Sequence, residues 1–200
     1  VLEPGLEGST IPTEFGTLNK LTSLHLEHIG LIGTIPTELG LMTALKELYT
    51  AVNGLEGSLP ETMRRLTNSL VDVVLFGNKL GGTLPRWLDE LNSLLYLDLG
   101  NNSFVGTIPE WPHLTNLLWL SAEQNKLTGT LPSFIFHNST NLNAILLFDN
   151  NLHGTLDGTN NDMNNNDSNN NNNTTQLQEL RILALGGNKF NSTIPTALLS

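Results

Sequence analysis

Residues 94–109 read LLYLDLGNNSFVGTIP, and this stretch decides the fold. Leucines at alternating positions make one side of a short extended segment apolar, while the other side carries Tyr96 and Asp98. The chain then leaves the strand at Asn102 and turns near Gly106. A strand this short cannot bury its apolar side alone, so we expect it to recur and to stack on copies of itself.

The same pattern, L-x-x-L-x-L-x-x-N-x-L-x-G-x-I/L-P, recurs along the chain, and successive copies begin 24, 25, 24, 23, 25 and 38 residues apart. A partial copy occupies residues 1–20, and an Asn-rich insertion over 157–175, expected to be a mobile loop, lengthens the last gap. The sequence therefore predicts one repeat domain over 1–200, in which stacked strands form a parallel sheet. The seven copies open at Leu21, Leu45, Leu70, Leu94, Leu117, Leu142 and Leu180.

This template resembles the plant-type leucine-rich repeat family, whose consensus continues N-x-L-x-G-x-I-P-x-x-L-G-x-L. The resemblance implies an α/β-type solenoid, a right-handed superhelix with a parallel sheet on its concave face and a mostly irregular or 3-10 convex side. It also implies extracellular repeats of the receptor-like kinase or receptor-like protein type. Relatives usually carry cysteine-paired terminal caps, and this sequence has no cysteine, so we expect an excerpt of a longer protein.

Recurrent asparagines stand where each strand ends and the chain turns. An amide side chain both donates and accepts, so a column of asparagines is expected to satisfy backbone groups of adjacent turns rather than to take part in catalysis. Ile29 takes this place in the first full repeat, where the ladder should be weaker or absent. The ladder residues are Asn53, Asn78, Asn102, Asn125, Asn150 and Asn188.

Composition excludes several functions for this segment. Nine basic residues against 19 acidic ones give a formal charge of −10, which disfavours nucleic-acid binding. No apolar stretch reaches the roughly 18 to 20 residues that cross a bilayer. The chain lacks a nucleophile elbow, an H-E-x-x-H motif and a phosphate-binding glycine loop. We therefore expect no catalytic residue, no cofactor and no metal.

Three polar groups offer alternative chemistry, and each has a plainer interpretation. His25, Glu27 and His28 lack a third ligand placed beside them, which favours ordinary surface residues over a metal site. The pair Glu47 and Asp72 occupies one column of adjacent repeats, as in a retaining glycosidase, but an open sheet provides no cleft to shift their pKa values. The spacing of the insertion's acids departs from a calcium-loop pattern. These acids are Asp157, Asp162 and Asp167.

The outward strand positions predict a concave binding surface that combines aromatic and acidic side chains. Exposed aromatics on a rigid surface are typical partner anchors, and carboxylates favour a basic peptide or protein. In the alternative, the aromatics pack on neighbouring strands and the acids are merely solvated. The predicted contact residues are Tyr49, Phe76, Tyr96, Trp119, Phe148, Glu47, Asp72, Asp98 and Glu123.

Together with the resemblance, the N-glycosylation sequons favour an extracellular or cell-surface setting, and a role in receptor-like signalling is the first hypothesis. A secreted enzyme inhibitor similar to the polygalacturonase-inhibiting proteins, and a structural or adhesive array, are the alternatives. A glycan on Asn101 would lie beside the proposed binding surface and would argue against it. The sequons begin at Asn101, Asn138, Asn166, Asn172, Asn173 and Asn191.

Overall fold

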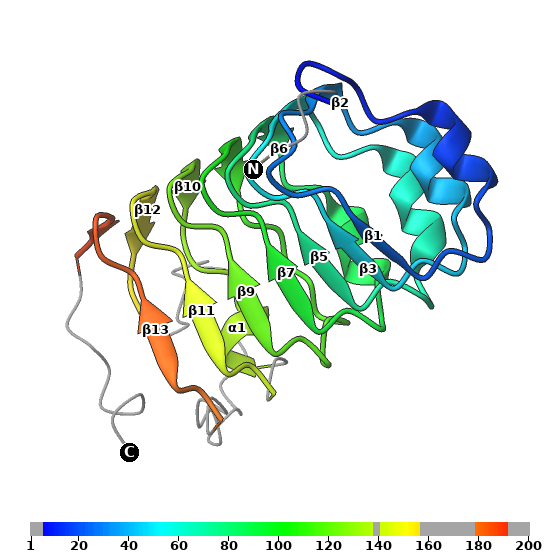
Figure 1. The fold of residues 1–200 in the computed structure, drawn as a ribbon. Coiled ribbons are helices and arrows are strands. Elements are labelled where there is room, and N and C mark those ends of the chain that lie inside the picture. Colours follow the sequence, from blue (N-terminus) through cyan, green and yellow to red (C-terminus); the bar gives the residue numbers. More distant parts are fainter. Residues whose placement is uncertain (1–5, 138–140, 157–178, 192–200) are drawn as a thin grey trace.

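The computed structural model describes residues 6–137, 141–156 and 179–191. Over these residues the chain winds into a curved stack of coils, and each sequence repeat contributes one coil (Figure 1). Two parallel sheets run along the stack, with short helices on the remaining side. The predicted repeat solenoid is confirmed.

The first sheet contains seven strands of three residues each, one from every full repeat. Neighbouring strands pair without a register shift, so that Leu24 lies beside Leu48 and Leu48 beside Val73. The central residue of a strand points into the core, while its two neighbours face outward. Residues at equivalent repeat positions therefore form columns across the sheet. The strands are β1 (Ser23–His25), β3 (Glu47–Tyr49), β5 (Asp72–Val74), β7 (Tyr96–Asp98), β9 (Trp119–Ser121), β11 (Ala144–Leu146) and β13 (Ile182–Ala184).

A second parallel sheet of seven strands is the main departure from the predicted fold. It forms where the chain follows the ladder asparagine, a stretch expected to be mostly irregular. Alternation is weak there and glycine is frequent, so pairing depends on the same segment of the adjacent repeats rather than on strand propensity. Its strands are β2 (Ile32–Thr34), β4 (Gly54–Gly57), β6 (Lys79–Thr83), β8 (Ser103–Thr107), β10 (Lys126–Gly129), β12 (Asn151–Gly154) and β14 (Lys189–Phe190).

Short helices form the side of the stack opposite the first sheet. A proline precedes each 3-10 helix. Proline suits this place because its φ is fixed near the helical value and because the first residues of a helix need no backbone N–H for an intrahelical bond. Among the described residues the helices are η1 (Thr13–Thr17), η2 (Thr37–Leu41), η3 (Glu61–Leu66), η4 (Arg86–Glu90) and one α-helix, α1 (Phe134–His137).

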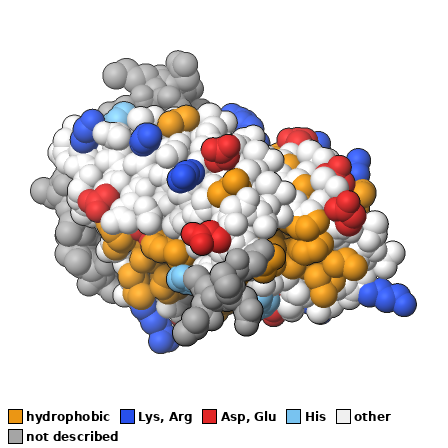
Figure 2. Space-filling view, turned by 45° about the horizontal axis from the view of Figure 1, so that its top comes forward, with side chains coloured by type: hydrophobic (Ala, Val, Ile, Leu, Met, Phe, Trp, Pro, Cys, Tyr) orange, Lys and Arg blue, Asp and Glu red, His pale blue; other side chains and the backbone are white. Residues whose placement is uncertain are grey.

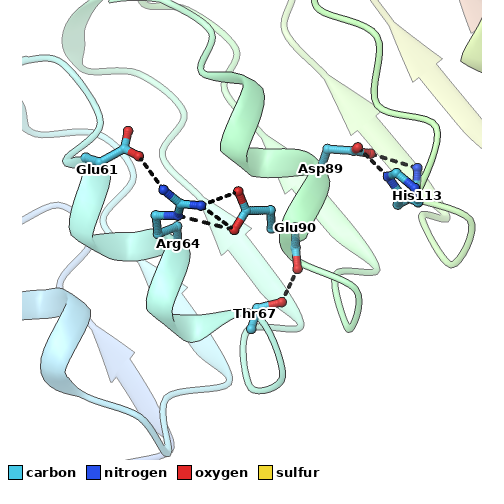
Figure 3. Close-up of polar contacts among 6 residues, drawn as sticks. All are labelled: Glu61, Arg64, Thr67, Asp89, Glu90 and His113. Atoms are coloured by element: carbon cyan, nitrogen blue, oxygen red, sulfur yellow. Dashed lines mark hydrogen bonds and ion pairs between the residues drawn. The ribbon is translucent and has the colours of Figure 1, made fainter.

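Polar contacts link the helices to the following repeat (Figure 3). Arg64 binds Glu61 of its own helix at 3.2 Å and Glu90 of η4 at 2.8 Å. Asp89 accepts the backbone N–H of His113 at 2.7 Å and lies 2.6 Å from its Nδ1. The Arg64 pairs are exposed, so each contributes little stability, and only the pair with Glu90 joins two repeats.

The core lies between the two sheets and the helices, and consists mainly of columns of leucine. A larger residue replaces leucine in the shortest repeat. Trp111 is fully buried in the shortest repeat, packs 5.6 Å from the ring of Phe134, and donates its indole N–H to the Pro85 carbonyl at 3.3 Å. Its polar atom is therefore satisfied inside the core.

The recurrent asparagines connect consecutive coils by the same set of hydrogen bonds. Asn125 Oδ1 accepts the N–H of Phe104, in the preceding repeat, at 2.9 Å. Its Nδ2 donates to the Leu99 carbonyl of that repeat at 3.0 Å and to the Ala122 carbonyl of its own repeat at 3.1 Å. Asn53, Asn78, Asn102, Asn150 and Asn188 make equivalent bonds.

The first full repeat lacks this side chain, since Ile29 takes its place. Asn53 reaches back to the N–H groups of Ile29 and Leu31, at 3.2 and 3.0 Å. The partial repeat is joined instead by backbone bonds, including Gly8 N–H to the Gly30 carbonyl at 2.9 Å.

Replacing Asn125 by Ala should lower the free energy of unfolding by about 3 kcal/mol, because several buried backbone groups lose their partners. Asn116 is a matched control: it is exposed, and its side chain donates to the Asn92 carbonyl alone among the described residues. Asn116→Ala should cost less than about 1 kcal/mol. Urea unfolding of both variants measures the difference, and equal losses would contradict the structural role of the ladder.

Glycines of the second sheet interlock with threonines of the preceding repeat. Gly129 has φ +83°, and a Cβ placed there would lie 2.7 Å from Cγ2 of Thr107. Gly154 also has a positive φ, and a Cβ placed there would lie 2.7 Å from Cγ2 of Thr130. The glycine is therefore required twice, for its left-handed backbone and for the close approach of a methyl group.

Gly129→Ala should destabilise the fold more than Gly8→Ala, by at least about 1 kcal/mol, because the two sites share a positive φ but only Gly129 is crowded. Adding Thr107→Ser removes the clashing methyl and should restore most of the difference. Thermal unfolding of the two single variants and the double variant completes a double-mutant cycle, which measures the coupling between Gly129 and Thr107. A double variant no more stable than Gly129→Ala would show that the methyl contact is unimportant.

Candidate interaction surface

The register of the first sheet brings the predicted contact residues into three columns. In the first column Glu47 lies beside Asp72, and Tyr96 lies beside Trp119. In the second, Tyr49 and Asp98 flank Val74. The third column follows the strands. It consists of Glu27, Ala51, Phe76, Gly100, Glu123, Phe148 and Gly186.

Tyr96 and Trp119 are neighbouring aromatic residues at the middle of the sheet, and we call them the aromatic pair. They are register partners on the adjacent strands β7 and β9 (Figure 1). Tyr96 is 41% exposed, while Trp119 is half-buried. A rigid strand fixes the backbone of both residues, so a partner that covered them would order few additional torsions.

His25, Glu47, Tyr49 and Asp72 form a connected polar group at the N-terminal end of the sheet. His25 Nε2 lies 3.4 Å from Glu47, and the imidazole ring packs 4.5 Å from the ring of Tyr49. The Tyr49 hydroxyl donates to Asp72 at 3.0 Å. His25 was expected to be an isolated surface residue, yet it links two strands of this group. No sequence pattern indicates that link, because it depends on side-chain direction across β1 and β3.

These contacts shift two pKa values in opposite directions. The Ser23 side chain, and after it His25, hold the pKa of the Glu47 carboxyl below its usual range by stabilising the charged form. Burial, and then the bond to Asp72, raise the pKa of Tyr49 from 10.0 to about 12, because both favour the neutral phenol. Glu47 is therefore a fixed negative charge, while Tyr49 remains a hydrogen-bond donor at physiological pH.

Glu123 is a correction to the predicted surface. It was expected to present a carboxylate to a partner, but the residue is buried, with only 7% of its surface exposed. The carboxylate lies over Gly100, where any Cβ would approach it to 2.4 Å, and it contacts the hydroxyl of Ser121. Ser121 also bonds to Asp98 at 2.8 Å. Two small residues on neighbouring positions make room for Glu123 to fold down onto the sheet.

The two phenylalanines of the third column lie apart from the aromatic pair. Phe76 and Phe148 are half-buried, and Gly100 and the buried Glu123 lie between them in the column. Asp98 accepts the N–H of Gly100 at 3.0 Å, which directs its carboxylate toward the same turn. The remaining surface therefore has Tyr96 and Trp119 at its centre and the connected polar group, with its two carboxylates, on its N-terminal side.

The alternative sites find no support among the described residues. His25 lies 3.8 Å from Glu27, but the described part of the chain contains no group of three or more His, Cys, Asp or Glu side chains able to hold a metal. The acids of the insertion lie outside it. Asn101 and Asn191 are exposed, and the other four predicted sequons also lie outside the described residues. No described helix has the length and apolar character of a membrane span.

Charged side chains do not gather on the view in Figure 2, which turns the upper edge of Figure 1 forward. Acidic and basic groups of both signs are scattered singly there among uncharged surface. The connected polar group of the first sheet differs from these scattered charges in two ways. Hydrogen bonds join its members, and its Asp72 is the register partner of Tyr96.

Known proteins resemble this chain both in architecture and in sequence. The family model described as Leucine Rich Repeat matches residues 93–114. Receptor-like protein 35 of Arabidopsis thaliana is 36% identical over 135 residues, which cover 67% of this chain and 12% of that protein. The leucine-rich repeat ectodomain of the Arabidopsis thaliana membrane receptor kinase GASSHO1/SCHENGEN3, solved with CASPARIAN STRIP INTEGRITY FACTOR 2, superposes with a TM-score of 0.84 at 32% identity. The chain belongs to the plant-type leucine-rich repeat family.

The superposition covers 96% of this chain and 21% of the GASSHO1/SCHENGEN3 chain. The plant peptide hormone receptor RGFR1, solved with RGF2, has a TM-score of 0.77 at 29% identity and matches 96% of this chain and 32% of its own. This leucine-rich repeat segment spans about a tenth of the length of the curated receptor-like proteins that it matches. It is non-catalytic, as its sequence predicts, since the similar proteins are receptor ectodomains and receptor-like proteins.

Tyr49 should ionise with a midpoint near pH 12. The chain has two tyrosines, so in a Tyr96→Phe variant the phenolate absorbance measured in a pH titration comes from Tyr49 alone. Because the folded pKa lies above the ordinary value of 10.0, the contribution of Tyr49 to stability is complete below pH 10 and is lost as the pH rises toward 12. Tyr49→Phe should abolish that part of the pH dependence. A midpoint near 10 in the folded chain would contradict the burial and the bond to Asp72.

Proposed function

We propose that this segment is a ligand-binding part of a receptor-like protein at the cell surface, and that it binds a basic, extended peptide or protein segment on its concave sheet. The observation that carries the proposal is the adjacency of Tyr96 and Trp119 on paired strands, next to the polar group around Asp72. Similarity to receptor-like protein 35 and to plant receptors solved with peptide ligands supports it.

The aromatic pair supplies the apolar part of the contact. Burying a Tyr or Trp side chain against a partner is a frequent source of binding energy, and strand geometry holds these two residues in place beforehand. Val105 offers a comparison on the second sheet: it is 40% exposed, close to the 41% of Tyr96, but it has no aromatic neighbour in the register. Exposure alone does not distinguish the surface, whereas the paired aromatics do.

The acidic group supplies charge preference. Glu47 and Asp72 are register partners, and Asp98 lies one strand further on in the next column. Lys and Arg are absent from the described outward positions of this sheet, and the positively charged neighbours that act on Glu47 are His25 and Lys46, which directly precedes it. Such an arrangement accelerates the approach of a basic partner and disfavours an acidic one.

A displayed library of random extended peptides, selected on the purified chain, tests the proposal. Enriched sequences should carry Lys or Arg, and their affinity should fall as ionic strength rises. Tyr96→Ala and Trp119→Ala should each weaken the enriched peptide by more than about 1 kcal/mol without loss of fold. Val105→Ala is the matched control and should leave affinity unchanged. Loss of affinity in Val105→Ala alone, or enrichment of acidic peptides, would contradict the proposal.

A further inference from the structure

We infer that Asn101 is an N-glycosylation site, and that its glycan occupies the border between the first and the second sheet at β7. The inference rests in part on the proposed cell-surface function, since glycan transfer to asparagine takes place in the secretory pathway. It depends on one turn, which is equivalent in every full repeat. Three properties of Asn101 in that turn carry it: its backbone conformation, its free side chain and the hydroxyl residue that follows.

The turn after each strand of the first sheet uses a left-handed backbone. Asn101 has φ +49°, and Gln124 and Asp149 have 52° and 55° at the equivalent position. Gly77 and Gly187 provide the same conformation without a side chain, with φ +69° and +67°. Asparagine tolerates this region better than most residues, so the backbone alone explains an asparagine here. It does not explain the rest of the sequon.

The rest of the sequon comes from two different structural positions. Asn102 is the buried ladder residue, whose amide donates to Leu75 and Leu99 and is not available for modification. Ser103 opens β8 and supplies the hydroxyl that the sequon requires. Other repeats carry Gly, Lys or Asn at the position of Ser103, so only this full repeat combines the turn asparagine with a hydroxyl residue two positions later.

The side chain of Asn101 is exposed while its backbone is fixed. Its N–H donates to the Glu123 carbonyl at 2.8 Å, and its carbonyl accepts the N–H of Asn78 at 3.2 Å. Within the described residues the side-chain amide makes no hydrogen bond. Gly77 precedes it in the column and leaves space on that side. A bulky substituent on Nδ2 would therefore project from the turn without displacing a structural contact.

The transfer itself uses a lipid-diphosphate-linked oligosaccharide as co-substrate. A bond forms between Nδ2 of Asn101 and the anomeric carbon of the first sugar, the bond from that carbon to the diphosphate breaks, and one amide proton is released. The glycan would then cover the border next to the third column, beside Gly100. The sequence alone led us to expect that such a glycan would argue against the binding surface. The register corrects this expectation, because Tyr96 lies in the first column, away from that border, so its face stays open to a partner.

Secretion of residues 1–200 from mammalian cells behind a signal peptide tests the acceptor independently of where the native protein resides. Enzymatic release of the glycan in isotopically labelled water converts a glycosylated Asn101 into labelled aspartate, which peptide mass spectrometry detects. We expect the label on Asn101 in most molecules. Ser103→Thr should retain it, Ser103→Ala should abolish it, and Asn101→Gln should leave thermal unfolding unchanged.

An unlabelled Asn101 in secreted, folded protein, or a label that persists in Ser103→Ala, would overturn the assignment. Either result would leave the binding proposal intact, because the peptide selection is done separately, on unglycosylated chain purified from bacteria. Conversely, a labelled Asn101 in a chain that selects no peptide would support the modification and refute the proposed partner.

Discussion

Backbone groups buried between successive coils impose the constraint on which the whole structure depends. Each coil leaves a strand, turns, and enters the second sheet within a few residues, so donors and acceptors of that turn face the next coil rather than water. The asparagine ladder satisfies them from both sides: Oδ1 accepts from the preceding repeat, and Nδ2 bridges the two repeats. Because one amide spans two coils, it also fixes their register.

Fixed register turns a periodic sequence into an ordered surface. Leu24, Leu48 and Val73 lie in step inside the sheet, and so their outward neighbours lie in step as well. The adjacency of Tyr96 and Trp119, which carries the proposed function, is a consequence of that alignment. A shift of one residue between coils would turn the outward side chains into the core, which the ladder prevents.

Structural features that recur in every repeat could be predicted from the sequence. Alternating leucines located the first sheet and its columns, whereas the 3-10 helices, each preceded by a proline, were expected only from the family resemblance. The second sheet was missed because its segments have little alternation and many glycines, and the pairing that stabilises them comes from neighbouring coils. The burial of Glu123 was missed for a related reason: it depends on Gly100 and Ser121 being small in two adjacent repeats, a coincidence that no period contains.

A crystal structure of the chain with a selected peptide would test the account most directly. The account predicts a peptide that lies across the first sheet, with contacts to Tyr96 and Trp119 and a basic side chain near Asp72. The peptide should make no contact with the border between the two sheets at Asn101. A peptide bound on the second sheet or along the 3-10 helices, with Tyr96 and Trp119 still open to solvent, would contradict the central claim.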